Sequence, residues 1–205
     1  ESGIIYTNTR KSVESLHTLL QKKGFSVTKY HAGLPDQERL KNQRAFITDD
    51  IPLMVATVAF GMGIHKPDIR FVCHMEMPKT MEQYYQEIGR AGRDGLPSEC
   101  LMLYSLRDVM LQKQFSNDVE DEGVRHHMRR KTDQLFAFCS SATCRRIDLL
   151  GYFGEIVQSP RCENCDNCVD DVEVVDGLVI AQKILSCVYR LDQRFGLNYV
   201  MDILT

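Results

Sequence analysis

Five short segments mark the first half of the chain; four are apolar runs, and one, residues 25–30, mixes apolar and polar residues. They lie at residues 3–6, 25–30, 53–56, 71–74 and 100–104. Apolar runs of four to six residues bounded by polar and turn-forming residues predict buried β-strands. We therefore expect five strands in this half of the chain.

Amphipathic segments separate these runs. Thr9 predicts the N-cap of a helix of about 15 residues that Gly24 ends, and Asp36 predicts the N-cap of a helix reaching to about Ile47. Thr80 is expected to begin a third helix. Strands that alternate with helices of this length predict a parallel sheet covered on both faces, which is a doubly wound α/β fold.

The pattern changes in the second half. Residues 106 to about 140 have the spacing of charged helices, and a short helix is expected to begin at Cys144. Residues 154–171 are irregular, and a new apolar helix follows Asp176. An acidic stretch at residues 170–173 is typical of a linker. The predicted division of the chain is residues 1–105, 106–171 and 172–205.

The composition is ordinary for a globular protein. Hydrophobic residues make up 43% and charged residues 26% of the 205 residues, and no apolar run approaches the roughly 18 residues of a membrane span. The chain opens with Glu1 and no methionine, so we expect it to be part of a larger protein. A net charge of −3 gives no overall attraction to nucleic acid, so such binding would need local basic groups. Those groups are Arg125, Arg129, Arg130 and Lys131, or Arg145 and Arg146.

Three cysteines within seven residues form a candidate metal site. Cys162, Cys165 and Cys168 are each separated by two residues, in a chain of eight cysteines without a secretion signal. A structural zinc site needs four ligands. Cys144 is the predicted fourth ligand, because a helix N-terminus and adjacent arginines stabilise a thiolate, and Cys139 is its rival. Free thiols and an iron–sulfur site are the alternatives. The cysteines outside this set are expected to be small core residues: Cys73, Cys100, Cys139 and Cys187.

The string Q-x-x-G-R-x-G-R at residues 86–93 is the candidate site for chemistry. If this segment is helical, Gln86, Arg90 and Arg93 share one face. Gly89 and Gly92 each cost roughly 1 kcal/mol relative to alanine inside a helix, which indicates that another group approaches the backbone closely. Guanidinium groups match phosphate oxygens, so the segment suits a polyphosphate. The alternative is a solvated or salt-bridged arginine pair.

Taken in order, the motifs of the chain resemble those of RecQ-family DNA helicases of superfamily 2. The arginine string resembles motif VI of that superfamily, and the chain departs from the family at His65, where Asp or Asn is usual. The other matching segments are residues 3–10 with motif IV, 30–34 with the motif after it, 55–70 with motif V, Cys144–Arg146 and the three later cysteines with the zinc-binding module, and 184–196 with the start of the winged-helix domain.

The resemblance implies an ATP-dependent DNA helicase of 3′→5′ polarity, of a family associated with DNA repair and recombination. On the match to motif VI, Arg93 is the arginine finger, Arg90 contacts or orients the phosphates, and Gln86 couples the site to DNA. The two glycines would then give clearance to a nucleotide held by a neighbouring domain. The implied cofactors are one structural Zn²⁺, with ATP and Mg²⁺ held mainly by a preceding RecA-like domain.

The resemblance also implies where DNA binds and how the chain folds. Asn8, Arg10 and Thr57 match positions at which the family contacts DNA phosphates, and the expected partners are single-stranded DNA and a duplex junction. The implied architecture is a second RecA-like domain with a doubly wound parallel sheet. A helical four-cysteine zinc-binding subdomain and a truncated winged helix would follow it.

Two motifs of nucleotide hydrolysis are missing. The chain has no G-x-x-x-x-G-K-[ST] and no acidic pair for magnesium, which the resemblance assigns to the preceding domain. We therefore expect the chain alone to hydrolyse no ATP. The competing interpretations are a zinc-stabilised binding module and an RNA helicase core. The compact zinc segment favours a bacterial cytoplasmic, nucleoid-associated protein, with a nuclear protein as the alternative.

Overall fold

Five strands and nine helices make up the described part of this computed structural model, which comprises residues 1–61, 64–170 and 176–204. The chain divides into two compact units, Glu1–Ser141 and Ala142–Thr205, which are described separately. In chain order the elements are β1 (Gly3–Tyr6), α1 (Arg10–Lys22), β2 (Val27–Tyr30), α2 (Asp36–Ile47), β3 (Leu53–Ala56), β4 (Phe71–His74), α3 (Met81–Ile88), β5 (Glu99–Met102), α4 (Leu106–Asn117), α5 (Glu122–Ser140), α6 (Arg145–Tyr152), α7 (Asp166–Val169), α8 (Leu178–Arg190) and α9 (Leu197–Leu204).

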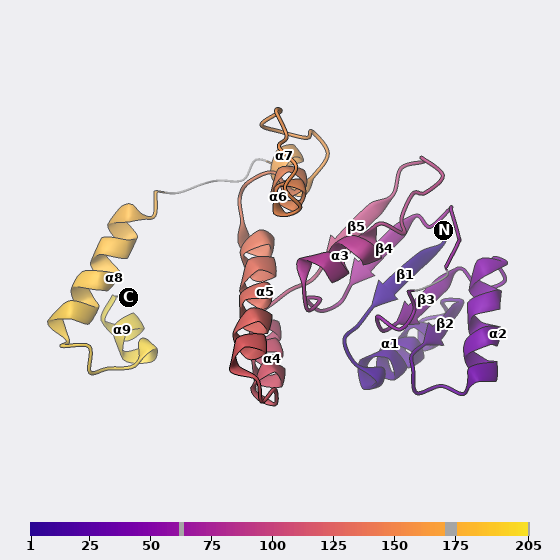
Figure 1. The fold of residues 1–205 in the computed structure, drawn as a ribbon, viewed down its shortest axis with the longest axis horizontal. Coiled ribbons are helices and arrows are strands. Elements are labelled where there is room, and N and C mark those ends of the chain that lie inside the picture. Colours follow the sequence, from indigo (N-terminus) through magenta and orange to yellow (C-terminus); the bar gives the residue numbers. More distant parts are fainter. Residues whose placement is uncertain (62–63, 171–175, 205) are drawn as a thin grey trace. The chain divides into compact units, whose positions relative to one another are not determined.

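The strands of the first unit form one parallel sheet in the order β2-β3-β1-β4-β5 (Figure 1). In the centre of the sheet, Gly3 of β1 is in register with Leu53 of β3 on one side and Phe71 of β4 on the other. Because all the strands are parallel, their carboxyl ends share one edge of the sheet and their amino ends share the opposite edge. The predicted parallel α/β sheet is confirmed.

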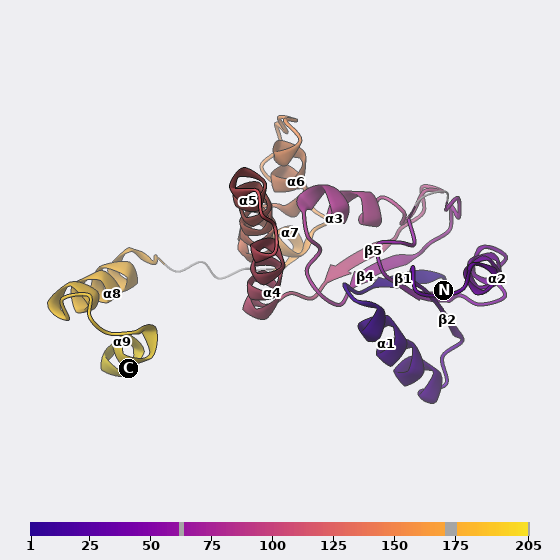
Figure 2. The same ribbon diagram turned by 60° about the horizontal axis from the view of Figure 1, so that its bottom comes forward.

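Helices cover both faces of this sheet, with α1 and α3 on opposite sides (Figure 2). On one face Val13 of α1 packs with Val27 and Val55. On the other face Phe46 of α2 packs with Ile4 and further strand residues. Successive strand residues point to opposite faces, so adjacent residues of one strand contribute to the two cores.

Several predicted boundaries are wrong in detail. The second strand begins at Val27 instead of residue 25, and the fifth is β5, Glu99–Met102, instead of residues 100–104. Asp36 does not cap α2, because Pro35 occupies the N-cap position with φ −55° and Asp36 is the first helical residue. There its carboxylate lies near the positive end of the helix dipole and pairs with Arg39.

The N-cap predicted for α1 and the helix start predicted at Thr80 are confirmed. The hydroxyl of Thr9 accepts a hydrogen bond from the Ser12 backbone N–H at 3.0 Å, and that of Thr80 accepts from Gln83 at 3.2 Å. Gly24 follows the last turn of α1 with φ +85°, a conformation that glycine adopts without steric cost.

The charged helical region consists of two helices, α4 and α5, which lie side by side (Figures 1 and 2). Helix α5 packs on the sheet domain through Phe138, whose ring lies 5.7 Å from that of Tyr84 in α3, and through Cys139, whose sulfur lies 3.9 Å from that of Met102. Both helices thus belong to the same compact unit as the sheet. The division at residues 105, 171 and 172 stays a prediction.

The second unit contains the four later helices. Helix α6 begins at Arg145 with Cys144 at its N-cap, as the sequence predicts. The segment predicted to be irregular contains the short helix α7. Helices α8 and α9 contact each other. The predicted acidic linker falls mainly on residues 171–173, which lie outside the described residues. In the part of the chain that the structure describes, no helix combines the length and the apolar character needed to cross a bilayer.

Candidate arginine site and metal centre

The arginine string forms a turn, not a helical face. Helix α3 ends at Ile88, and Gly89 is its C-cap. Gln86 is exposed on the helix, Arg90 is buried, and Arg93 is exposed beyond the helix end. The condition under which the three side chains would share one helical face is therefore not met, because the helix stops before either arginine.

Arg90 is directed into the first unit. Its side chain is 4% exposed, and a Cβ atom built on Gly61 would lie 3.1 Å from its Nη2. Burial raises the pKa of Tyr6, and the neighbouring Arg90 guanidinium opposes that rise. Among the described residues, Nε of Arg90 has no hydrogen-bond partner. This conformation packs Arg90 against the connection after β3, and its predicted contact with phosphates stays a prediction.

Arg93 is exposed and yet anchored at two points. Its Nε donates to the carbonyl oxygen of Gly89 at 3.0 Å, and its Nη1 donates to that of Ile64 at 3.0 Å. Arginine has five N–H donors in a planar fork, so these two bonds fix the plane of the guanidinium and leave further donors. The side chain is thus oriented before any ligand arrives.

Gly92 is required by the turn. Its φ is +62°, and an added Cβ would lie 2.6 Å from Oγ of Ser98 and 2.9 Å from the carbonyl oxygen of Leu96. The expected close approach to the backbone is therefore present here, but the approaching group is residues 96–98 of the same unit. At Gly89 an added Cβ would meet only carbonyl oxygens of its own helix, the nearer at 3.2 Å.

The ion pair between Arg70 and Asp94 holds the segment before β4 beside residues 89–95, which we call the arginine turn. Arg70 makes a bidentate contact with Asp94, with both Nη2–O distances 2.7 Å. The Arg70 guanidinium holds the pKa of Asp94 below its ordinary value. Lys66 is 2% exposed and contacts Asp49 at 2.6 Å and Asp68 at 3.1 Å. The contacts of Arg70 with Asp94 and of Lys66 with Asp49 were not expected from the sequence, because each joins residues that are far apart in the chain.

The candidate DNA-contacting residues lie at the edge of the sheet that is formed by the carboxyl ends of the strands. Asn8 and Arg10 follow the carboxyl end of β1, and Thr57 follows that of β3. The amide of Asn8 donates to the carbonyl oxygen of Met77 at 3.0 Å, and the N–H of Thr57 donates to that of Tyr30 at 3.1 Å. Arg10 is exposed at the start of α1.

The arginine turn is bonded to the amino-end edge instead, because the N–H of Gly92 donates to Ile69, two residues before β4. The structure therefore does not bring the two groups of candidate residues together. The connection from Thr57 to Ile69 runs from one edge to the other. Its Met62 and Gly63, which belong to the predicted motif V, lie outside the described residues, and His65 is exposed.

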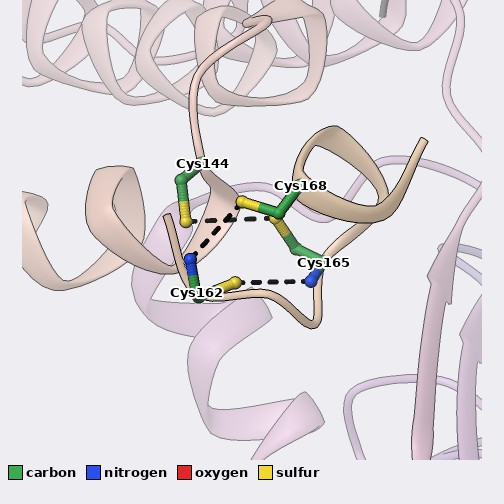
Figure 3. A group of neighbouring side chains, drawn as sticks. All are labelled: Cys144, Cys162, Cys165 and Cys168. Carbon is green, nitrogen blue, oxygen red and sulfur yellow. Dashed lines mark hydrogen bonds between the residues drawn. The ribbon is translucent and has the colours of Figure 1, made fainter. Parts of the chain in front are cut away.

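Four cysteine sulfurs gather in the second unit. Cys144, Cys162, Cys165 and Cys168 place their Sγ atoms within 4.8 Å of one another, and Figure 3 shows the side chains pointing toward one another. A tetrahedral site with Zn–S bonds of about 2.3 Å needs sulfurs about 3.8 Å apart. The Sγ atoms of Cys144 and Cys165 are 3.9 Å apart. The four-sulfur donor set and its spacing therefore fit a structural zinc ion.

Backbone N–H groups support thiolates in this cluster. The N–H of Cys165 lies 3.3 Å from Sγ of Cys162, and the N–H of Cys162 lies 3.4 Å from Sγ of Cys168. Burial acts to raise the pKa of Cys162, but the N–H groups of Asn164 and Cys165 and the neighbouring thiols lower it to about 6. The opposite holds for Cys165, whose pKa is raised to about 12 by burial and the neighbouring thiols. Metal ligation needs the deprotonated form, so these bonds favour binding.

Arg145 connects the two segments that carry the cysteines. Its Nε and Nη2 each lie 3.1 Å from a carboxylate oxygen of Asp166, and Nη2 lies 3.3 Å from Asn167. Asn167 in turn donates to the carbonyl oxygen of Thr143 at 2.6 Å. Sequence reasoning missed this role for Arg145, although its position next to a ligand was a signal that could have found it.

Other cysteines and basic residues are placed as follows. Cys139 is buried against Met102 in the first unit, so it is not the fourth sulfur of the cluster. Cys187 is buried as predicted, but Cys100 is exposed, because it lies on the edge strand β5. None of the eight cysteines, all of which belong to the described residues, forms a disulfide. Some predicted basic groups have partners within the chain: Arg129 contacts Ser116 and Asn117, Lys131 contacts Glu82, and Arg145 contacts Asp166.

Three family models match successive parts of the chain. The helicase conserved C-terminal domain matches residues 1–95, the RecQ zinc-binding model matches residues 106–169, and the RQC domain matches residues 171–205. The second match contains all four clustered cysteines.

Two curated proteins resemble the chain along its whole length, and a solved structure resembles part of it. The ATP-dependent DNA helicase RecQ of Pasteurella multocida is 46% identical over 210 residues, covering 100% of this chain and 32% of that protein. A putative ATP-dependent RNA helicase of Acanthamoeba polyphaga mimivirus is 40% identical over 214 residues, covering 100% of this chain and 39% of that protein. A solved DEAD box protein from Methanococcus jannaschii has a TM-score of 0.49 at 25% identity, with 57% of this chain and 32% of that chain covered.

The chain spans about a third of the length of the curated RecQ relatives it matches. Within that third, the three family models follow one another without overlap. With relatives that cover the whole chain at 40–46% identity, this chain belongs to the RecQ family and comprises helicase C-terminal, zinc-binding and RQC sequence.

Proposed function

We propose that this chain is the C-terminal part of an ATP-dependent DNA helicase that moves 3′→5′ and couples ATP hydrolysis to unwinding of duplex DNA. Family membership supports this function, and so does the P. multocida relative, which is named an ATP-dependent DNA helicase. The mimivirus relative is named a putative RNA helicase, so the nucleic acid has to be tested directly.

The observation that carries the proposal is the exposure of Arg93 together with the fixed orientation of its side chain. Arg93 is exposed on the turn after α3, and the carbonyl oxygens of Gly89 and Ile64 fix the orientation of its guanidinium. Such a group suits an arginine finger, which stabilises the charge that develops on a transferring phosphoryl group without reorganising. Arg90 packs behind this turn, and we assign it an orienting role.

The rest of the nucleotide site belongs to a partner domain. A preceding RecA-like domain would supply the phosphate-binding loop and the acidic residues that hold Mg²⁺, and ATP would bind between the two domains. Arg93 would then reach the phosphates from the side of this chain, with Gln86 exposed on the adjacent helix. Closure around ATP and opening after hydrolysis would change the distance between the domains.

Single-stranded DNA would bind at the carboxyl edge of the sheet. Arg10 supplies an exposed positive charge there, and Asn8 and Thr57 lie at the ends of neighbouring strands. The connection that begins at Thr57 reaches Ile64, which accepts the hydrogen bond from Arg93. A continuous segment thus joins the DNA edge to the finger, which supports coupling between the two.

Cys144, Cys162, Cys165 and Cys168 would hold one zinc ion in this protein. The ion would supply a cross-link between α6 and the α7 segment, in addition to the contacts of Arg145 with Asp166 and Asn167. Exposed Arg146 lies next to this centre and would offer a positive charge to duplex DNA.

The test uses the full-length protein and the 205-residue chain in parallel. The full-length protein is expected to hydrolyse ATP on addition of single-stranded DNA and to unwind a duplex with a 3′ overhang. The chain alone is expected to hydrolyse none. Turnover by the isolated chain, or faster unwinding of an RNA duplex than of the matching DNA duplex, would contradict the proposal. For localisation we propose the bacterial nucleoid, with a nucleus as the alternative, to be tested by imaging a tagged protein.

A further inference from the structure

A buried acid–base pair lies in the first unit, outside the candidate site. His74 and Glu87 are 1% and 3% exposed, and Nε2 of His74 lies 2.7 Å from Oε2 of Glu87. Carboxylates are rarely buried so completely, because removing an ionisable group from water is costly unless it is paired. The proposed reaction uses neither side chain.

The pair connects the sheet to the start of the arginine turn. His74 is the last residue of β4, and Glu87 lies in the last turn of α3. The backbone carbonyl of Glu87 accepts a hydrogen bond from the N–H of Arg90 at 3.3 Å. Two residues after Glu87, the carbonyl of Gly89 accepts from Nε of Arg93. The position of Glu87 therefore determines the backbone positions from which the side chains of Arg90 and Arg93 extend.

Neighbouring side chains fix the pair on several sides. Nε2 of Gln83 donates to Oε1 of Glu87 at 3.0 Å, which leaves Oε2 for His74. The imidazole stacks on the ring of Tyr6 with centroids 5.4 Å apart and an interplanar angle of 22°. The ring of Tyr84 lies at the same centroid distance, tilted by 58°. The contacts leave the imidazole little room to rotate.

The contact with Glu87 is the polar anchor of His74. Among the described residues, Nδ1 of His74 is buried without a hydrogen-bond partner. The ring that stacks on it, Tyr6, donates its hydroxyl to the carbonyl oxygen of Phe60 at 2.9 Å. Phe60 precedes Gly61, against which Arg90 packs. Through Tyr6, the pair therefore contacts the segment between β3 and β4, which also contacts Arg90 and Arg93.

We propose that His74 and Glu87 are positioning residues that hold the end of α3 so that Arg93 is oriented for phosphoryl transfer. This inference rests on the proposed function. It assigns to the pair an effect on turnover, with little effect on ATP binding, because neither side chain reaches the surface where a nucleotide would bind.

A purely stabilising role makes a different prediction. Buried ion pairs can often be replaced by apolar residues of similar size with little loss of stability. The double variant His74→Leu/Glu87→Leu should therefore fold, while it removes the directional contact. If the pair only stabilised the fold, this variant would retain the wild-type turnover rate.

The first experiment measures DNA-stimulated ATP turnover by the full-length protein. In the double variant, kcat is expected to fall about 100-fold, the effect of a displacement of about 1 Å in a catalytic group, with KM for ATP nearly unchanged. His74→Gln is expected to restore most of the rate, because its amide can donate to Glu87. Met54→Leu, which alters a fully buried residue of the same core, is the control for repacking. A wild-type kcat in the folded double variant would overturn the proposal.

The second experiment needs no ATP and uses the 205-residue chain. Solvent exchange of the Arg93 Nε–H, followed by ¹⁵N NMR, is expected to be slow in the wild type and faster in the double variant. If the double variant does not fold, Glu87→Gln keeps the shape, weakens the contact and is expected to give a smaller increase. Unchanged exchange in whichever of these variants folds would overturn the positioning role. If the full-length wild type hydrolyses no ATP, the proposed function fails, but the exchange result still decides the positioning role.

Discussion

Arg93 donates from Nη1 to the carbonyl oxygen of Ile64 at 3.0 Å, although 29 positions separate the two residues. This bond joins the turn after α3 to the connection between β3 and β4. Those are the two segments of the chain that resemble helicase motifs VI and V. The arginine is therefore oriented by the fold of its own domain, before any nucleotide or partner domain is present.

Replacing Arg93 should remove turnover and spare ATP binding. In the full-length protein, Arg93→Ala is expected to lower ATP turnover by about 10³-fold or more, because the charge that develops on the phosphoryl group loses its partner. Arg93→Lys should also be slow, since an ammonium cannot reproduce the planar fork. Single-turnover kinetics and a nucleotide-binding titration separate the two effects. Arg44→Ala, at an exposed position of α2, is the control, and a rate for Arg93→Ala close to that control would remove Arg93 from the role.

The two glycines at positive φ in the arginine turn should differ in their tolerance of alanine. At Gly95 an added Cβ meets nothing within 4 Å, so Gly95→Ala should cost only the left-handed backbone strain, about 1 kcal/mol. At Gly92 the Cβ would also lie 2.6 Å from Ser98, and the overpacking should add about 2 kcal/mol. Urea unfolding of the two variants measures the difference. Equal stabilities would mean that residues 96–98 can move aside freely.

Local features of the sequence were predicted well. Short apolar runs identified the strands, Thr9 and Thr80 identified two helix starts, and cysteine spacing identified the metal cluster. Except for Cys144, the fourth sulfur, each of these depends on residues that are close in the chain. The wrong helix cap at Asp36 has a local cause too, since Pro35 takes the cap position.

Features that depend on the sheet were not predicted. The exposure of Cys100 follows from its place on an edge strand, and strand order cannot be read from the pattern of one strand. The contact between His74 and Glu87 joins a strand end to a helix end. The offsets of Gln86, Arg90 and Arg93 would fit one helical face if the segment were helical, but the helix ends at Ile88 with Gly89 as its C-cap.

Arg145 and its neighbour Arg146 should have separable roles. Arg145→Ala removes the contacts with Asp166 and Asn167 and is expected to weaken zinc binding about tenfold, as loss of outer-shell support typically does. Arg146 is exposed, so Arg146→Ala should leave zinc affinity within about twofold. Competition with a chromophoric chelator gives both affinities. Equal losses of zinc affinity in the two variants would mean that the contacts of Arg145 do not support the zinc site.

Metal removal should affect the two units differently. One zinc ion per chain is expected by elemental analysis, with no visible absorption of an iron–sulfur cluster. A chelator, or Cys162→Ser, should increase hydrogen exchange in residues 142–170, because the cross-link is lost. The sheet domain should be unaffected, since all four sulfurs lie in the second unit. Cys139→Ser is the matched control and should retain the metal; loss of zinc from that variant would contradict the assigned ligand set.

The pair formed by Arg70 and Asp94 predicts an acid sensitivity of the first unit. The Arg70 guanidinium holds the pKa of Asp94 below its ordinary value of 3.8 in the folded chain. A carboxylate with a lowered folded pKa binds more protons when unfolded, so its stabilising contribution is complete above its ordinary pKa. That contribution is lost as the pH falls through the lower folded value.

The measurement compares the free energy of unfolding of wild type and Asp94→Asn in urea between about pH 6 and pH 2.5. The wild type should have the larger free energy of unfolding. Its difference from Asp94→Asn should be constant at the upper end of this pH range and disappear at the lower end. Because part of the Asp94 side chain is exposed, with a relative accessibility of 24%, the advantage should also shrink in about 1 M salt. An advantage that persists at the lowest pH would mean that Asp94 acts through its backbone turn, and that its charge contributes nothing to stability.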